Sequence, residues 1–115
     1  MRTDEGHRKI RVVCNIAATH LERLGFTVLK TATRSPTFDL VAFNDHHTLF
    51  ISTRRVRSLK TVTQLTNTYQ DLIHDMQKTH VPHYVEKQLW IYQNKRGFII
   101  YKLFENGIMK KEMHT

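Results

Sequence analysis

The chain of 115 residues has only one cysteine, Cys14, which excludes an intramolecular disulfide and any site built from several cysteines, such as a zinc ribbon. Four glycines and two prolines leave little linker material, so we expect a single domain over residues 1–115. No apolar run approaches the roughly 18 residues of a membrane span. The charged segment 1–11 has no apolar core of a signal peptide behind it. We therefore expect no membrane partner and an intracellular location, cytoplasmic or with the nucleoid or nucleus.

The composition of the chain is dominated by positive charge. Lysine and arginine number 18 against 10 aspartates and glutamates, which gives a formal net charge of +8 and a pI near 9.9. Hydrophobic residues make up 40% of the chain, which is enough to build a core. A surplus of positive charge on a small domain favours a polyanionic partner, and nucleic acid is the commonest one.

Hydrophobic periodicity predicts the order of helices and strands. The predicted elements are a helix over residues 3–24, strands over 26–30, 38–43 and 48–53, a helix over 58–78, and strands over 88–92 and 98–104. Gly25 stands where a helix end favours a left-handed residue. The segment 54–60 is expected to lead out of the third strand, and 105–115 to form a polar tail. We therefore predict an α/β fold with a mixed sheet, one helix on each side, and the second helix as a crossover.

One group of polar residues stands out on two adjoining strands. Asp39 is predicted to be the second residue of an apolar strand, where an ionised carboxylate needs a partner. Ser52 and Arg54 are two residues apart on the neighbouring strand and therefore share one face. The simplest interpretation is a cross-strand ion pair between Asp39 and Arg54 with no catalytic role.

The stretch LERLGFTVLKTATRSPTFDLVAFNDHHTLFISTRRVR also resembles the core of the PD-(D/E)XK nuclease superfamily, and within it the archaeal Holliday-junction resolvases. The helix end and following strand of that family are matched here by Leu21, Gly25, Phe26 and Val28, and its Asp-Leu-Val-Ala strand by the residues 39–42. The resemblance covers about residues 5–57 and implies a restriction-endonuclease-like fold, a DNA partner that includes branched DNA, and a homodimer.

The resemblance also implies a site, from which this chain departs. In the family two acids hold a divalent ion and a lysine assists catalysis. Asp39 matches the first acid, but Ser52 stands at the position of the metal-binding glutamate and Arg54 at that of the lysine. Serine is a poor ligand for a hard cation, and arginine stays protonated and cannot act as a base. The three positions therefore predict a degenerate site that needs no cofactor, in a protein that binds DNA without cutting it efficiently.

Two other functions are kept as alternatives. An active Mg²⁺-dependent endonuclease would use Asp39 as a metal ligand together with an acid that has moved to another position; the candidates are Asp71, Asp75, Glu22 and Glu5. An interaction module would use the former nuclease surface to bind an acidic protein. The favoured function is that of a DNA-binding accessory protein in replication, recombination or the processing of mobile elements.

Basic residues are the candidate contacts to nucleic acid, because they neutralise phosphates without reading the base sequence. The predicted DNA-binding residues are Arg8, Lys9, Arg11, Arg34, Arg54, Arg55, Arg57 and Lys60. Three histidines close in sequence, His74, His80 and His83, have no spacing typical of a zinc site, which makes proximity to phosphates the favoured interpretation. Cys14 lies on the apolar face of the first predicted helix and is expected to be a buried, small hydrophobic residue.

Overall fold

The computed structural model describes residues 2–31, 37–57, 61–94 and 96–111, with side chains described from Val12 onward. Its elements are α1 (Arg2–Arg23), β1 (Thr27–Lys30), β2 (Leu40–Phe43), β3 (Thr48–Val56), α2 (Val62–Thr68), α3 (Gln70–Lys78), β4 (Val85–Gln93), β5 (Gly97–Phe104) and β6 (Gly107–Lys111). No helix in these described ranges is long and apolar enough to cross a membrane.

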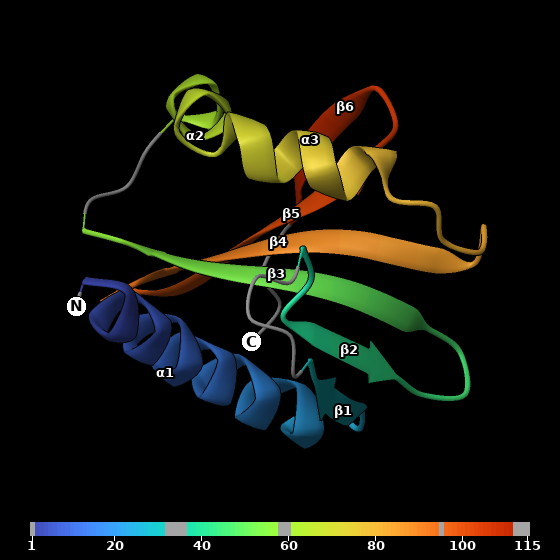
Figure 1. Cartoon of the computed structure of the whole chain (residues 1–115). Coiled ribbons are helices and arrows are strands. Elements are labelled where there is room, and N and C mark those ends of the chain that lie inside the picture. Colours follow the sequence, from blue (N-terminus) through green and yellow to red (C-terminus); the bar gives the residue numbers. More distant parts are fainter. Residues whose placement is uncertain (1, 32–36, 58–60, 95, 112–115) are drawn as a thin grey trace.

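The strands form one six-stranded sheet in which the spatial order follows the order along the chain. Neighbouring strands are antiparallel except β3 and β4, which run parallel and are connected through α2 and α3. Figure 1 shows α1 on one side of the sheet and α2 and α3 on the other. The predicted α/β fold with a mixed sheet and a helical crossover is therefore confirmed.

The sheet is buried on both faces by two hydrophobic clusters. On one face Val13, Ala17 and Leu21 of α1 pack in the same cluster as Ile51 and Trp90. On the other face the α2 and α3 side chains pack against the sheet; this cluster includes Leu65, Ile73, Met76, Leu89, Ile91 and Tyr101. The helix end was predicted correctly: Gly25 has φ 94°, and the N–H of Phe26 donates to Leu21 O at 3.0 Å.

The single helix predicted over 58–78 is wrong, because two helices meet at Tyr69. The backbone of Tyr69 has φ −111° and ψ 28°, outside the helical range. In α2 the hydroxyls of Thr66 and Thr68 donate back to carbonyls one turn earlier, at 3.1 and 2.9 Å, and such bonds bend helices. The helix begins after Thr61, which forms a capping box with Gln64.

The polar tail predicted over 105–115 is also wrong in part, because residues 107–111 form β6. This strand pairs antiparallel with β5, from Phe104 opposite Gly107 to Ile100 opposite Lys111. The two-residue turn before it is formed by Glu105 and Asn106, and Gly107 is the first residue of the strand. The two lysines that end β6 hid this strand from a search for apolar runs.

Candidate functional site

Asp39 lies directly before β2, which begins at Leu40, and its backbone bonds to both neighbouring strands. Its N–H donates to Ile51 O at 2.8 Å, and its carbonyl accepts from the N–H of Thr31 at 3.0 Å. The expectation that Asp39 is the second residue of a strand needs correction, since β2 begins at Leu40. The two backbone bonds nevertheless fix Asp39 between β1 and β3.

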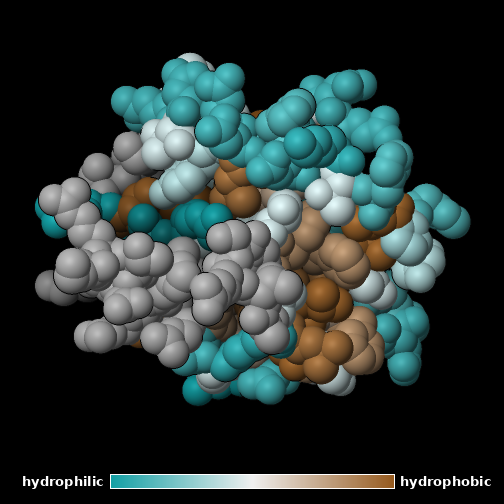
Figure 2. Space-filling view, viewed as in Figure 1, coloured by the Kyte–Doolittle hydropathy of each residue, from teal (hydrophilic) through white to brown (hydrophobic). Residues whose placement is uncertain are grey.

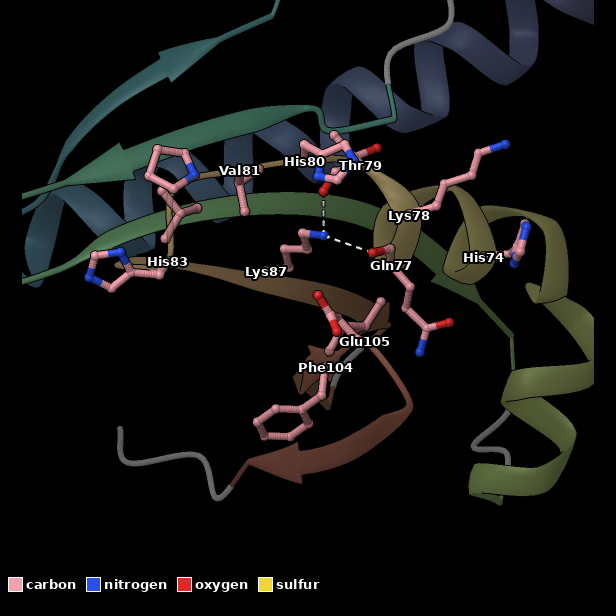
Figure 3. Close-up of a pocket in the computed structure, with 13 residues that line it drawn as sticks. His74, Gln77, Lys78, Thr79, His80, Val81, His83, Lys87, Phe104 and Glu105 are labelled. Carbon is pink, nitrogen blue, oxygen red and sulfur yellow. Dashed lines mark hydrogen bonds between the residues drawn. The ribbon is translucent and has the colours of Figure 1, made fainter.

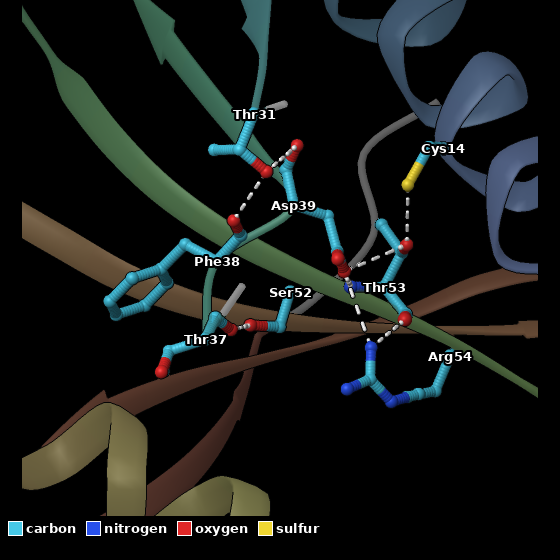
Figure 4. Close-up of polar contacts among 8 residues, drawn as sticks. All are labelled: Cys14, Thr31, Thr37, Phe38, Asp39, Ser52, Thr53 and Arg54. Atoms are coloured by element: carbon cyan, nitrogen blue, oxygen red, sulfur yellow. Dashed lines mark hydrogen bonds and ion pairs between the residues drawn. The ribbon is translucent and has the colours of Figure 1, made fainter. Parts of the chain in front are cut away.

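The carboxylate of Asp39 is only 7% exposed and is surrounded by donors from β3 (Figure 4). Its Oδ2 accepts from the backbone N–H of Thr53 at 2.7 Å and from the Thr53 hydroxyl at 3.2 Å. The Nη1 of Arg54 forms an ion pair with the same oxygen at 3.3 Å. A buried carboxylate is tolerated when it is paired and hydrogen-bonded in this way.

Arg54 is held at two points but remains partly open. Its Nη1 also donates to the backbone carbonyl of Thr53 at 2.6 Å, while the side chain is 24% exposed. Figure 4 shows the other two guanidinium nitrogens pointing away from Asp39. The cation is therefore fixed on one side and can still donate on the other.

Tyr69, at the junction of α2 and α3, lies within the electrostatic reach of Arg54. Burial raises the pKa of Tyr69, and the positive charge of Arg54 partly opposes this rise. Because side chains alternate along β3 and Thr53 faces α1, Arg54 projects toward the side of the sheet that α2 and α3 cover.

Ser52 does not join this ion pair. Its side chain is fully buried, and its hydroxyl donates to the backbone carbonyl of Thr37. The structure therefore brings together Asp39 and Arg54 of the three predicted positions, whereas the hydroxyl of Ser52 serves the segment that precedes β2.

Two residues that the sequence did not assign to the site complete the network. Thr53 is fully buried and supplies two of the donors to Asp39. The Sγ of Cys14 in α1 lies 3.1 Å from the Thr53 hydroxyl, and burial raises the pKa of this thiol. Cys14 is buried as predicted, but it also links α1 to the site. Only the alternation of side chains along β3, which turns Thr53 toward α1, could have indicated this contact.

The donor set around Asp39 does not fit a divalent cation. The one carboxylate, that of Asp39, is already paired with Arg54. Ser52 is uncharged, and its hydroxyl donates to the Thr37 carbonyl. Among the described residues, no group of three His, Cys, Asp or Glu side chains is placed to hold a metal ion. Of the acids considered as replacements, Asp75 pairs with Lys78 at 3.3 Å and the Asp71 and Glu22 side chains are exposed. The Glu5 side chain lies outside the described residues.

The predicted basic residues are only partly placed. Arg54 and Arg55 both belong to β3, which extends to Val56, so the segment expected to leave the strand at residue 54 is still part of the sheet. Because side chains alternate along a strand, Arg54 and Arg55 point to opposite faces. Arg57 is exposed directly after β3. The side chains of Arg8, Lys9 and Arg11, together with Arg34 and Lys60, lie outside the described residues.

Comparison with known proteins identifies the fold. No protein-family model and no curated protein matches the chain. Among solved structures, it is similar to Hjc, a Holliday junction resolvase from the archaeal hyperthermophile Archaeoglobus fulgidus, with a TM-score of 0.51 and 17% sequence identity over 76% of this chain and 74% of that chain. At this identity the similarity concerns the fold alone. It confirms the predicted restriction-endonuclease-like architecture: a mixed sheet flanked by helices.

Proposed function

We propose that this chain is a DNA-binding protein on a nuclease-like scaffold, which grips DNA, including branched DNA, without cutting it efficiently. Support comes from the net charge of +8, from the fold shared with a Holliday junction resolvase, and from the geometry around Arg54. As an accessory protein it would act in DNA replication, recombination or the processing of mobile elements, as one domain over residues 1–115.

The anchored guanidinium of Arg54 is the observation that carries the proposal. Asp39 and the Thr53 carbonyl hold Nη1, so the side chain loses little further freedom when the open nitrogens meet a phosphate. Arginine suits this role, because its planar donor group matches phosphate oxygens and stays charged at any physiological pH. Arg57, exposed three residues further along the chain, adds a second cation at the same end of β3.

Efficient cleavage would require groups that the network does not offer. Arg54 cannot accept a proton from water, and Asp39 already neutralises a cation. The role proposed for the pair is therefore to bind a phosphate of the DNA backbone rather than to activate water. The alternative, a Mg²⁺-dependent endonuclease, needs an acid from outside this network.

Salt-dependent binding to a labelled four-way DNA junction tests the proposal. Replacing Arg54 with alanine should weaken binding and reduce the slope of log affinity against log salt by about one, because one phosphate contact is lost. Arg23→Ala removes the same charge from an exposed position on α1 and serves as the matched control. Equal slopes for wild type and Arg54→Ala would reject the assignment of this contact.

We propose a homodimer as well. Exposed apolar side chains lie at the β1–β2 edge of the sheet, among them Leu29, which is 56% exposed, and Phe43, which is 38% exposed. Figure 2 shows hydrophilic side chains over α2 and α3 and hydrophobic ones nearer this edge. Such exposed apolar surface is typical of protein contacts. Sedimentation of the wild type as a monomer at micromolar concentration would reject the dimer.

A further inference from the structure

Three exposed arginines gather at one end of the sheet. The parallel strands β3 and β4 both end there and β5 begins there, on the left of Figure 1. Arg55 is the last residue but one of β3, Arg57 follows that strand directly, and Arg96 lies in the turn between β4 and β5. All three side chains are exposed. We call these three residues the arginine end.

Two segments that are far apart in the sequence are tied together at this end. Val56 pairs with Gln93 and Gln93 with Gly97, so the first and the last of these are two strand spacings apart, roughly 10 Å. The Gln93 side chain donates to Arg57 O at 3.4 Å, and the N–H of Arg96 donates to Gln93 O at 3.0 Å. Arg57 and Arg96 are therefore held near each other before any ligand binds.

Three acidic side chains lie at the opposite end of the strands. Asp45 precedes β3, Glu86 is near the start of β4, and Glu105 follows the end of β5. Because β3 and β4 run parallel and β5 runs antiparallel to them, all three acids are far from Arg57. Within the described part of the chain, the residues of the arginine end take part in no ion pair. Their charge is therefore open to an external anion.

The lysines in a cleft at the end of α3 are, in contrast, already engaged within the protein (Figure 3). The ammonium group of Lys87 donates to Thr79 O at 2.6 Å and to Gln77 O at 3.1 Å, so it caps the carbonyl end of the helix. Lys78 pairs with Asp75 at 3.3 Å. The arginine end is therefore the better place for a polyanion.

DNA is the partner whose charge density fits the arginine end. A duplex carries one negative charge per about 1.7 Å of its axis, so a stretch of about 10 Å presents about six phosphates. The planar donor groups of arginine match phosphate oxygens and stay charged at physiological pH. Ligands of open sheets also bind beyond the carboxyl ends of the parallel strands, and β3 and β4 both end here.

We propose that the arginine end holds the backbone of a DNA duplex that lies across the end of the sheet. The inference rests on the proposed function and adds to it a second segment of the chain, with Arg96 as a DNA contact. Arg54 and Arg55 face opposite sides of β3. A duplex across the end meets both of them, whereas a duplex along the face that α2 and α3 cover meets Arg54 and not Arg55.

Salt titrations with a labelled DNA duplex test this surface. Arg96→Ala should weaken binding severalfold and lower the slope of log affinity against log salt by about one, because one phosphate contact is lost. Arg57→Ala should have the same effect, and the double variant should lower the slope by about two. Arg23→Ala, at an exposed position in the last turn of α1, is the matched control and should leave the slope almost unchanged.

Arg55→Ala distinguishes the two positions of the duplex. A slope lowered by about one supports a duplex across the end of the sheet. An unchanged slope would overturn that position. If Arg54→Ala lowers the slope but Arg57→Ala and Arg96→Ala do not, the arginine end is rejected while the contact at Arg54 stands. The opposite result would support the arginine end and reject the contact at Arg54.

A photocrosslink gives a second readout that does not depend on measured affinities. With Cys14→Ala as background, Arg96→Cys and, as control, Arg23→Cys are each labelled with a photoreactive maleimide and mixed with the duplex at low salt. Illumination should join DNA to position 96 and not to position 23. Equal crosslinking from both positions, or none from position 96, would refute the proposal.

Discussion

Two carboxylates, Asp39 directly before β2 and Glu86 in β4, are both neutralised by cations, yet their surroundings differ. Asp39 is 7% exposed, and the bonds described above come from Thr53 and Arg54 of one adjoining strand. Glu86 has a side chain that is 21% exposed and uses both oxygens. It pairs with Lys102 on β5 at 3.2 Å and Lys111 on β6 at 2.9 Å.

The comparison separates a structural ion pair from one that holds a cation ready for a ligand. Lys102 and Lys111 bring Glu86 together with two further strands, so its charge is balanced by a network across the β4–β6 part of the sheet. Asp39 instead holds one nitrogen of Arg54 and leaves the rest of the guanidinium open. We therefore expect removal of Glu86 to affect stability alone, and removal of Asp39 to affect both stability and DNA binding.

The largest expected effect is that of Asp39→Ala. This change leaves Arg54 without its counterion and the buried N–H of Thr53 without an acceptor. Breaking a buried pair in this way should lower the free energy of unfolding by about 3 kcal/mol. Urea denaturation measures the loss, with Asp39→Asn as the milder variant that keeps an acceptor. A loss as small as that of an exposed pair would contradict the buried network.

Glu86→Gln should lower the free energy of unfolding less, by about 1 kcal/mol or less. Its lysine partners are partly exposed, and water screens their charge. DNA affinity should not fall. Reduced junction binding by Glu86→Gln, at unchanged folding, would remove the distinction between the two carboxylates.

The carboxylate of Glu86 also makes the stability of the fold depend on pH. Burial alone would raise the pKa of Glu86, but the hydrogen bonds from Gln88 and Lys111 outweigh it and hold the pKa below the ordinary value. Its contribution to stability is therefore complete above the unfolded pKa, about 4.3, and is lost as the pH falls through the folded value. Denaturation curves of wild type and Glu86→Gln should converge in acid. A constant difference between them down to the lowest pH would contradict the lowered pKa.

The smallest expected effect is that of Cys14→Ala, which removes the contact between α1 and Thr53. The free energy of unfolding should fall by about 1 kcal/mol or less, and junction affinity should stay unchanged, since Asp39 keeps all of its donors. Burial raises the pKa of the Cys14 thiol, so a disulfide reagent should label the folded wild type slowly. Labelling as fast as in the urea-unfolded chain would show that the thiol is accessible and the contact absent.

The sequence predicted what side-chain patterns encode. The helix before Gly25 was found from the regular spacing of its apolar residues, and the hairpin around residues 44–47 from a polar tip between two short apolar runs. The break at Tyr69 was missed, because the apolar spacing continues from Leu65 to Ile73 and both side chains enter the same cluster. The strand β6 was missed because its stability comes from pairing with β5 rather than from its own composition.

The same limit applies to the site. The pairing of Asp39 with Arg54 could be anticipated, because opposite charges on adjoining strands attract. The role of Thr53 could not be anticipated, because its shortest bond to Asp39 comes from its backbone N–H, which almost every residue type has. The bond from Ser52 to the carbonyl of Thr37 was hidden for the same reason. The cleft at the end of α3 is lined by residues from the run 74–87 and by residues 103–105, and only the fold brings these two stretches together.

One gel experiment tests the central claim most directly. Labelled four-way junction DNA is mixed with wild type or Asp39→Asn in the presence of Mg²⁺ or Mn²⁺, and binding and cleavage are both read. Our account predicts shifted, intact DNA with the wild type. It also predicts a weaker shift with Asp39→Asn, although this variant is one unit more positive, because the ion pair that positions Arg54 is lost. Cleavage by the wild type that disappears in Asp39→Asn would contradict the account and show a working metal site.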